Sequence, residues 1–201
     1  MNKMVSKIYG IGRGWVFSQK DFSALTTRRS IDVTLNRLMK AGTIRRLMRG
    51  IYDYPQKSTL FAGYSVPDPD RIVQAIARKN SWRIQPIGDT ALNALGLSTQ
   101  VVAKLIYLSD GPSRIYERNN GGIIEFRHMT QREMGVLDIK SALVVQALKA
   151  LGRGRVTDKI RDKLSRILPE KDKKKLMREA QYVTGWVYEE IRKICSERPN
   201  E

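Results

Sequence analysis

The chain of 201 residues contains a single cysteine, Cys195, and a single histidine, His128. One cysteine excludes an intrachain disulfide, and the sequence therefore does not resemble a disulfide-stabilised secreted domain. One histidine, with no cysteine near it in sequence, argues against a zinc site and against a Cys–His catalytic pair. We therefore expect a protein that is not an enzyme, with no catalytic residues, no metal and no cofactor.

Long apolar runs are also missing from the sequence. No stretch approaches the ~20 apolar residues of a membrane-spanning helix. The N-terminal segment MNKMVSKIYGIGRGW lacks the apolar centre of a signal peptide. These absences favour a cytoplasmic protein that has no membrane partner.

Acidic side chains are scarce relative to basic ones. The chain has 37 Lys and Arg against 20 Asp and Glu, which gives a formal net charge of +17 and a pI near 10.2. The first 55 residues carry 11 of the basic side chains and only 3 of the acidic ones. Such a surface attracts phosphate backbones, and hydrophobic residues, at 41%, still suffice for a core.

The basic N-terminal part contains a well-defined helix pattern. Thr27 is a suitable N-cap for a helix from Arg28 to Lys40, in which Ile31, Leu35 and Leu38 recur on one apolar face. A first helix, with Ser18 as its N-cap and with Phe22 and Leu25 facing the core, is expected to precede it. The face opposite the apolar one is expected to consist of Arg29, Ser30, Val33, Thr34, Arg37 and Lys40.

A basic hairpin is expected directly after this helix. Ala41-Gly42 ends the helix, and two short strands at 43–47 and 50–54 flank a turn. Helix, turn, helix and basic hairpin are together the layout of a winged helix-turn-helix, which places one helix in the major groove and a wing over the backbone. The expected DNA-binding residues are Arg28, Arg29, Ser30, Thr34, Arg37, Lys40, Arg45, Arg46 and Arg49.

The rest of the chain predicts a second, mixed domain. Asp68 and Pro69 open a helix, and strands and helices then alternate without the regular order of a doubly wound sheet. The expected elements are strands at 81–86 and 105–109, a helix at 88–97, a hairpin of 113–118 with 122–128, and helices at 141–151 and 156–168. We predict an α+β fold: a winged helix-turn-helix domain at 1–56, then an α+β domain at 66–201 extended by C-terminal helices.

The last segment predicts one amphipathic helix of about 25 residues from Glu170 onward. Apolar residues recur at steps of three or four from Leu176 to Ile194, and Lys171, Lys173, Lys174, Lys175 and Arg178 crowd the first turns. This pattern suits a helix packed on its own domain, a dimer seam, or a surface offered to nucleic acid. The sequence does not separate the three.

Two segments resemble a known family. RRSIDVTLNRLMKAGTIRRLMRGIY resembles the winged-helix domain of AbiEi-type antitoxins, and IQPIGDTALNALGLSTQVVAKLIYLSDGPSR resembles the block that follows it in that family. The resemblance covers about residues 1–150, with Val102 standing where a proline is expected. It implies the antitoxin and autorepressor of a type IV, abortive-infection toxin–antitoxin operon. Its partners would be operator repeats in duplex DNA, bound as a possible homodimer, and a nucleotidyltransferase-like toxin neutralised without a stable complex.

Three other functions compete with this interpretation. An RNA-binding protein fits the charge equally well. A non-catalytic protein-interaction module would use the same helix and hairpin on a protein partner. A nucleotidyltransferase or nuclease needs clustered carboxylates around a metal, and the pair Asp68 and Asp70 is better explained by helix capping.

Overall fold

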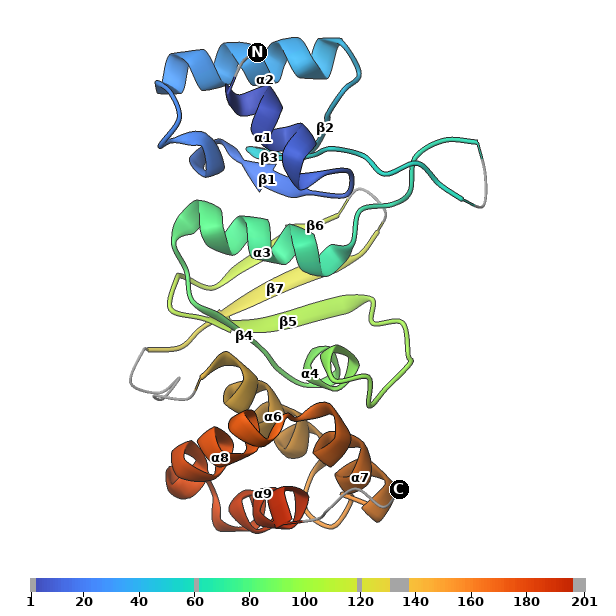
Figure 1. Ribbon diagram of the computed structural model, residues 1–201, viewed down its shortest axis with the longest axis vertical. Helices are drawn as coiled ribbons and strands as arrows, with labels where there is room; N and C mark the ends of the chain where they lie inside the picture. The colour runs from blue at the N-terminus through green and yellow to red at the C-terminus, as the bar shows by residue number, and fades with distance from the viewer. Residues whose placement is uncertain (1–2, 60–61, 119–120, 131–137, 197–201) are drawn as a thin grey trace. The chain divides into compact units, whose positions relative to one another are not determined.

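The computed structural model describes residues 3–59, 62–118, 121–130 and 138–196 and is a mixed α+β structure, which confirms the expected class. The chain divides into two compact units. The first comprises Met1–Arg83 with Arg118–Asn120, and the second comprises Ile84–Glu117 with Gly121–Glu201. Each unit has its own sheet and its own buried cluster (Figure 1).

The first unit wraps helices around a small antiparallel sheet of order β1-β3-β2. Strand β3 pairs with β1 over Val16–Ser18 and with β2, where the register shifts between Arg46 and Met48. The elements are α1 (Lys3–Ile11), β1 (Val16–Ser18), the 3-10 turn η1 (Gln19–Phe22), α2 (Arg28–Lys40), β2 (Arg45–Met48), β3 (Ile51–Asp53) and α3 (Pro69–Asn80).

An aromatic centre fixes α2 against the sheet. Phe17 on β1 lies 5.4 Å from the Phe22 ring and 6.2 Å from the Tyr52 ring, measured between centroids. The apolar face of α2 packs into this centre as the heptad-like spacing predicts. The buried cluster consists of Met4, Ile8, Phe17, Phe22, Ile31, Leu35, Leu38, Ile44 and Tyr52.

Helix α3 belongs to the first unit, whereas the sequence placed it in the second domain. Its cations bind backbone carbonyls of the N-terminal elements: Arg78 donates to Val16 O (2.9 Å) and Arg71 to Gly14 O (2.8 Å). Arg78 also pairs with the Asp21 carboxylate at 3.0 Å. The unit boundary therefore falls after Arg83 rather than in the connection at 56–66.

The second unit combines a mixed sheet with a group of helices. The sheet has the order β4-β5-β7-β6, in which only β5 and β7 are parallel. The expected hairpin is confirmed as β6 paired with β7, although residues 119–120 of its turn lie outside the described residues. The elements are β4 (Ile84–Pro86), α4 (Asp89–Ala94), β5 (Lys104–Ser109), β6 (Arg114–Glu117), β7 (Ile123–His128), α6 (Ile139–Leu151), α7 (Asp158–Ile167), α8 (Glu170–Glu179), η2 (Ala180–Tyr182) and α9 (Gly185–Ser196).

The expected 25-residue terminal helix is wrong, because the chain breaks after Tyr182. Val183 is extended, with φ −82° and ψ 171°, and the Thr184 carbonyl then accepts the first bonds of α9. The break lets α9 pack on α8, and the apolar stripe from Leu176 to Ile194 packs in one cluster with residues of α6 and α7, fully buried except for the partly buried Val183. Because this apolar stripe packs inside the unit, it is not exposed as a surface for dimerisation.

A carboxylate on β7 is held between two cations. Glu125 accepts from Arg127 at 2.8 Å and from Lys104 at 2.6 Å. The Arg127 bond and then the Lys104 bond lower the pKa of Glu125 from 4.5 to about 2. A depressed pKa stabilises the fold above the ordinary pKa, and that stabilisation is lost as the pH falls from 4.5 toward 2.

We expect Glu125→Gln to reduce stability most above pH 4.5, with the difference from the parent chain shrinking as the pH approaches 2. Urea unfolding midpoints measured across this range test the prediction. Glu117→Gln on the neighbouring strand β6 removes an exposed carboxylate and serves as the control. A difference for Glu125→Gln that is constant with pH would show that the carboxylate charge is not what stabilises this part of the sheet.

Candidate nucleic-acid interface

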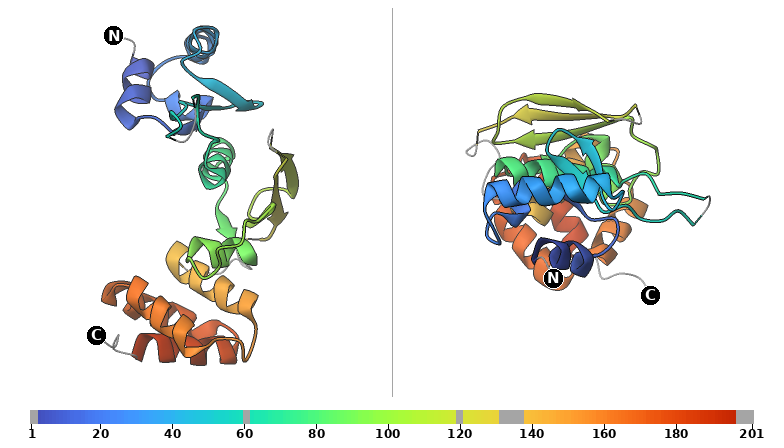
Figure 2. Two further views of the ribbon diagram at one scale, coloured as in Figure 1. Left: turned by 90° about the vertical axis from the view of Figure 1, so that its right-hand side faces the viewer. Right: turned by 90° about the horizontal axis from the view of Figure 1, so that it is seen from above.

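Helix α2 begins and ends at sequence-encoded signals. The Thr27 hydroxyl accepts the Ser30 N–H at 3.4 Å, and Gly42, at φ +67°, turns the chain out of the helix. Because Ile31, Leu35 and Leu38 are buried, the opposite face points outward. Figure 2 (left) shows α2 end-on, with α1 and the strands of its unit to one side.

The outward face matches the sequence prediction except at one residue. Arg28, Arg29, Ser30, Arg37 and Lys40 are exposed as expected. Thr34 is only 5% exposed, and its placement on the DNA-binding face is wrong. It lies three residues after Ile31 and four before Leu38, which puts it on the buried side of the helix.

Two residues between the cations were not among the expected DNA-binding residues, although Val33 was expected on this face. Val33 is 64% exposed and lies one turn from both Arg29 and Arg37. Asn36 is exposed beside it. An apolar side chain can contact a thymine methyl group and an asparagine can pair with adenine, so this face carries base-reading chemistry besides charge. The i, i+4 spacing of Arg29, Val33 and Arg37 was the available signal.

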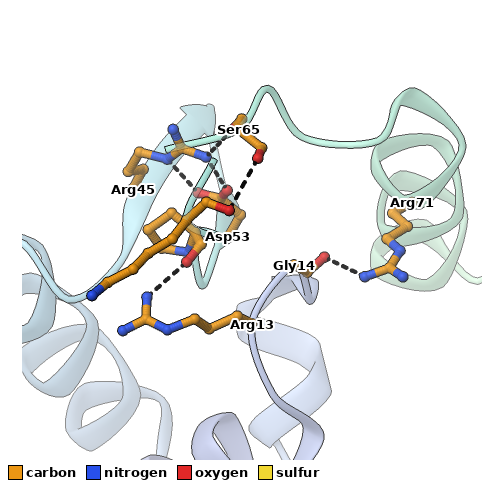
Figure 3. A network of polar contacts seen from close by, with 8 residues as sticks. Arg13, Gly14, Arg45, Asp53, Ser65 and Arg71 are labelled. Atoms are coloured by element: carbon orange, nitrogen blue, oxygen red, sulfur yellow. Dashed lines mark hydrogen bonds and ion pairs between the residues drawn. The ribbon is translucent and has the colours of Figure 1, made fainter. Parts of the chain in front are cut away.

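Arg45 does not extend into solvent as a wing residue. Its guanidinium binds the Asp53 carboxylate through two bonds, of 2.6 and 3.1 Å, and donates to Ser65 O at 3.1 Å (Figure 3). The Asp53 residue is 1% exposed. The Tyr64 ring lies 5.6 Å from the guanidinium. Arg45, which was expected to contact DNA, is therefore paired with a buried acid opposite it on β3, and its bond to Ser65 O ties that residue to the sheet.

Arg46 and Arg49 keep the exposed positions expected of a wing. Arg46 is opposite Tyr52, whose ring packs in the same cluster as α2. Since paired residues share a face of the sheet, Arg46 lies on the α2 side and Arg45 on the other. Gly50, at φ +77°, closes the turn, and Lys79 donates to the Arg49 carbonyl at 3.0 Å.

Two of the three acids of the first 55 residues pair with cations outside this face, and the third, Asp32, is exposed on α2 itself. Asp21 pairs with Arg78 and accepts the Ser18 N–H, Asp32 accepts from the Gln19 amide, and Asp53 binds Arg45. In the part of the chain that the structure describes, no ion pair neutralises the cations of the α2 face and the hairpin, namely Arg28, Arg29, Arg37, Lys40, Arg46 and Arg49. These six side chains form the cationic face.

Other kinds of site find little support. Across residues 3–59, 62–118, 121–130 and 138–196, no group of three His, Cys, Asp or Glu is placed to hold a metal ion. His128 Nδ1 lies 2.9 Å from the Gly111 carbonyl, a structural bond within its own unit. Burial raises the pKa of the Cys195 thiol, which disfavours the nucleophilic thiolate. None of the helices described is long and apolar enough to cross a bilayer.

Comparison with known proteins assigns the chain to a family without assigning an activity. The chain belongs to DUF6088, a family of unknown function, whose model matches residues 3–176. No curated protein matches it. Among solved structures, the crystal structure of the RV2827C protein from Mycobacterium tuberculosis is similar at 12% sequence identity and a TM-score of 0.43, covering 90% of this chain and 71% of that one.

Replacing each of the adjacent arginines of β2 should affect stability to different extents. Arg45→Ala leaves the Asp53 carboxylate buried without its cation, and we expect a loss of about 1–3 kcal/mol, discounted because Arg45 is 34% exposed. Arg46→Ala removes an exposed side chain and should change stability by less than about 0.5 kcal/mol. Urea unfolding followed by the fluorescence of Trp15 and Trp82 measures both. Equal losses would refute the division of the two arginines between fold and surface.

Proposed function

We propose that the first unit is a winged helix-turn-helix that binds duplex DNA, with α2 in the major groove and the β2–β3 hairpin as the wing. The carrying observation is the cationic face: in the described part of the chain none of its six side chains forms an ion pair, while Asp21 and Asp53 pair with Arg78 and Arg45. The order of η1, α2 and a paired hairpin supports the same assignment.

The proposed contacts divide by chemistry. Arg29, Val33 and Arg37 lie on one line of α2, where arginine suits guanine and the valine suits a thymine methyl group. Arg46 and Arg49 suit phosphates next to the groove, because they are exposed on the hairpin. Arg45 and Thr34 are not part of the proposed interface, since Arg45 pairs with Asp53 and Thr34 is buried.

The biological role is proposed from the sequence resemblance to AbiEi-type antitoxins. We infer that the chain represses its own operon and neutralises a linked nucleotidyltransferase-like toxin in the cytoplasm. In this proposal the cationic face of the first unit binds the operator. The second unit is then assigned to neutralising the toxin. Finding a toxin reading frame next to this gene would support the role, and finding none would remove the reason for proposing it.

Structured RNA is the second candidate ligand, because its phosphates would also be drawn to the cationic face. A helix that reads bases needs the wide major groove of B-DNA, whereas the major groove of A-form RNA is deep and narrow. Competition between a duplex from the region upstream of the gene and a structured RNA separates the two. Preference for the RNA at equal salt would overturn the DNA assignment.

Arg29→Ala and Arg37→Ala should each weaken binding to the upstream duplex by about 1–3 kcal/mol if the side chain reads a base. Gel-shift titration of the full chain at one fixed salt concentration measures the change. Arg192→Ala on α9 removes an exposed helical arginine of the second unit and should leave the affinity unchanged. Unaltered affinity in both α2 variants would exclude this helix from recognition.

A further inference from the structure

Helix α8 carries five cations along its length, and the structure divides them into two groups. Lys173 is 4% exposed and lies 2.9 Å from the Glu170 carboxylate, while Lys175 lies 2.9 Å from Asp138. Lys171, Lys174 and Arg178 are exposed instead. Their spacing of three and four residues places them in one row along the helix. We call these three side chains the basic stripe.

The acids of α8 do not neutralise the basic stripe. Glu170 binds Lys173, and Asp172 binds Lys140 of α6 at 2.5 Å. Glu179 accepts the Asp138 N–H at 2.9 Å. Within the described residues, no ion pair or side-chain hydrogen bond involves the basic stripe. The carboxylates of α8 thus bind other groups of the second unit, and the basic stripe is left exposed to solvent.

An aromatic ring continues the row. Tyr182, in η2, follows Arg178 by four residues and is 89% exposed. Its neighbours Ala180 and Val187 are buried in the helical cluster, so the break between α8 and α9 anchors the backbone on which the ring stands. From Lys171 to Tyr182 the row is about 17 Å long at helical rise. An exposed ring beside cations is the composition of surfaces that bind single strands.

We propose that the basic stripe and Tyr182 bind single-stranded nucleic acid. The three cations hold consecutive phosphates, and the Tyr182 ring stacks on an unpaired base. A duplex offers this ring no base face, because its bases are stacked on one another, and an acidic polypeptide gives it no stacking partner. This surface is separate from the cationic face of α2 and does not depend on its proposed function.

Fluorescence anisotropy of the full chain with labelled oligouridylate and oligothymidylate of about 20 nucleotides tests the proposal. We expect Tyr182→Ala to weaken binding about tenfold and Tyr182→Phe to keep it within about twofold, since phenylalanine retains the stacking face. The triple variant Lys171→Ala, Lys174→Ala, Arg178→Ala should lower the log–log salt slope by about 2. The ratio of the two affinities distinguishes RNA from DNA.

A second triple variant, Lys149→Ala, Arg153→Ala, Arg155→Ala, removes three other exposed cations of the same unit and is the matched control. Circular dichroism establishes that each variant is folded. Equal losses in the two triple variants would overturn the proposal, because the effect would then be one of net charge. So would normal binding by Tyr182→Ala together with competition by polyglutamate, which would identify a surface for acidic polypeptides. Arg29→Ala should leave single-strand binding intact whatever it does to the duplex.

Discussion

The placement of scarce carboxylates decides which surfaces of this protein remain positively charged. The chain has 20 acidic side chains for 37 basic ones, so there are too few carboxylates to pair with every cation. In the first unit, the Asp53 carboxylate takes Arg45 and the Asp21 carboxylate takes Arg78. Both pairs lie away from the outer face of α2. The cationic face therefore results from where the acids are, as much as from where the arginines are.

Helix α2 shows how far the sequence determines such a surface. Its cap, its glycine stop and its three apolar residues at helical spacing were sufficient to predict its bounds, and the structure has them at Arg28 and Lys40. The helical periodicity gave the wrong face only for Thr34. A residue at the margin of an apolar stripe is buried or exposed according to what packs beside it. The hairpin was predicted from its glycine, but the partner of Arg45 was not. A strand register that shifts at a bulge decides which residue stands opposite Asp53, and no local pattern specifies it.

The second unit was harder to predict for a related reason. Its strands were recognisable one by one, whereas the parallel pairing of β5 with β7 depends on contacts distant in sequence. The apolar stripe after Glu170 was read as one helix because its period continues across the break at Val183. Two helices that bury their apolar faces in the same cluster preserve the period, so the pattern alone does not separate one long helix from two short ones. Helix α3 was assigned to the second domain, whereas it belongs to the first unit. Its cations donate to carbonyls of the N-terminal elements, and composition does not reveal such contacts.

Those carbonyl contacts also explain how a unit so rich in cations can be held together and keep its charge. Arg13 donates to the Pro55 carbonyl at 2.8 Å (Figure 3), and Lys7 donates to Asp21 O at 2.6 Å. A hydrogen bond to a neutral carbonyl fixes a guanidinium or an ammonium group in place without cancelling its charge, as a carboxylate would. The structural cations therefore add to the field of the exposed ones, and the self-repulsion that this costs is offset when a polyanion binds. A protein that used its lysines and arginines only for solubility would gain nothing from this arrangement, whereas one that binds phosphate backbones gains attraction from every cation in its scaffold.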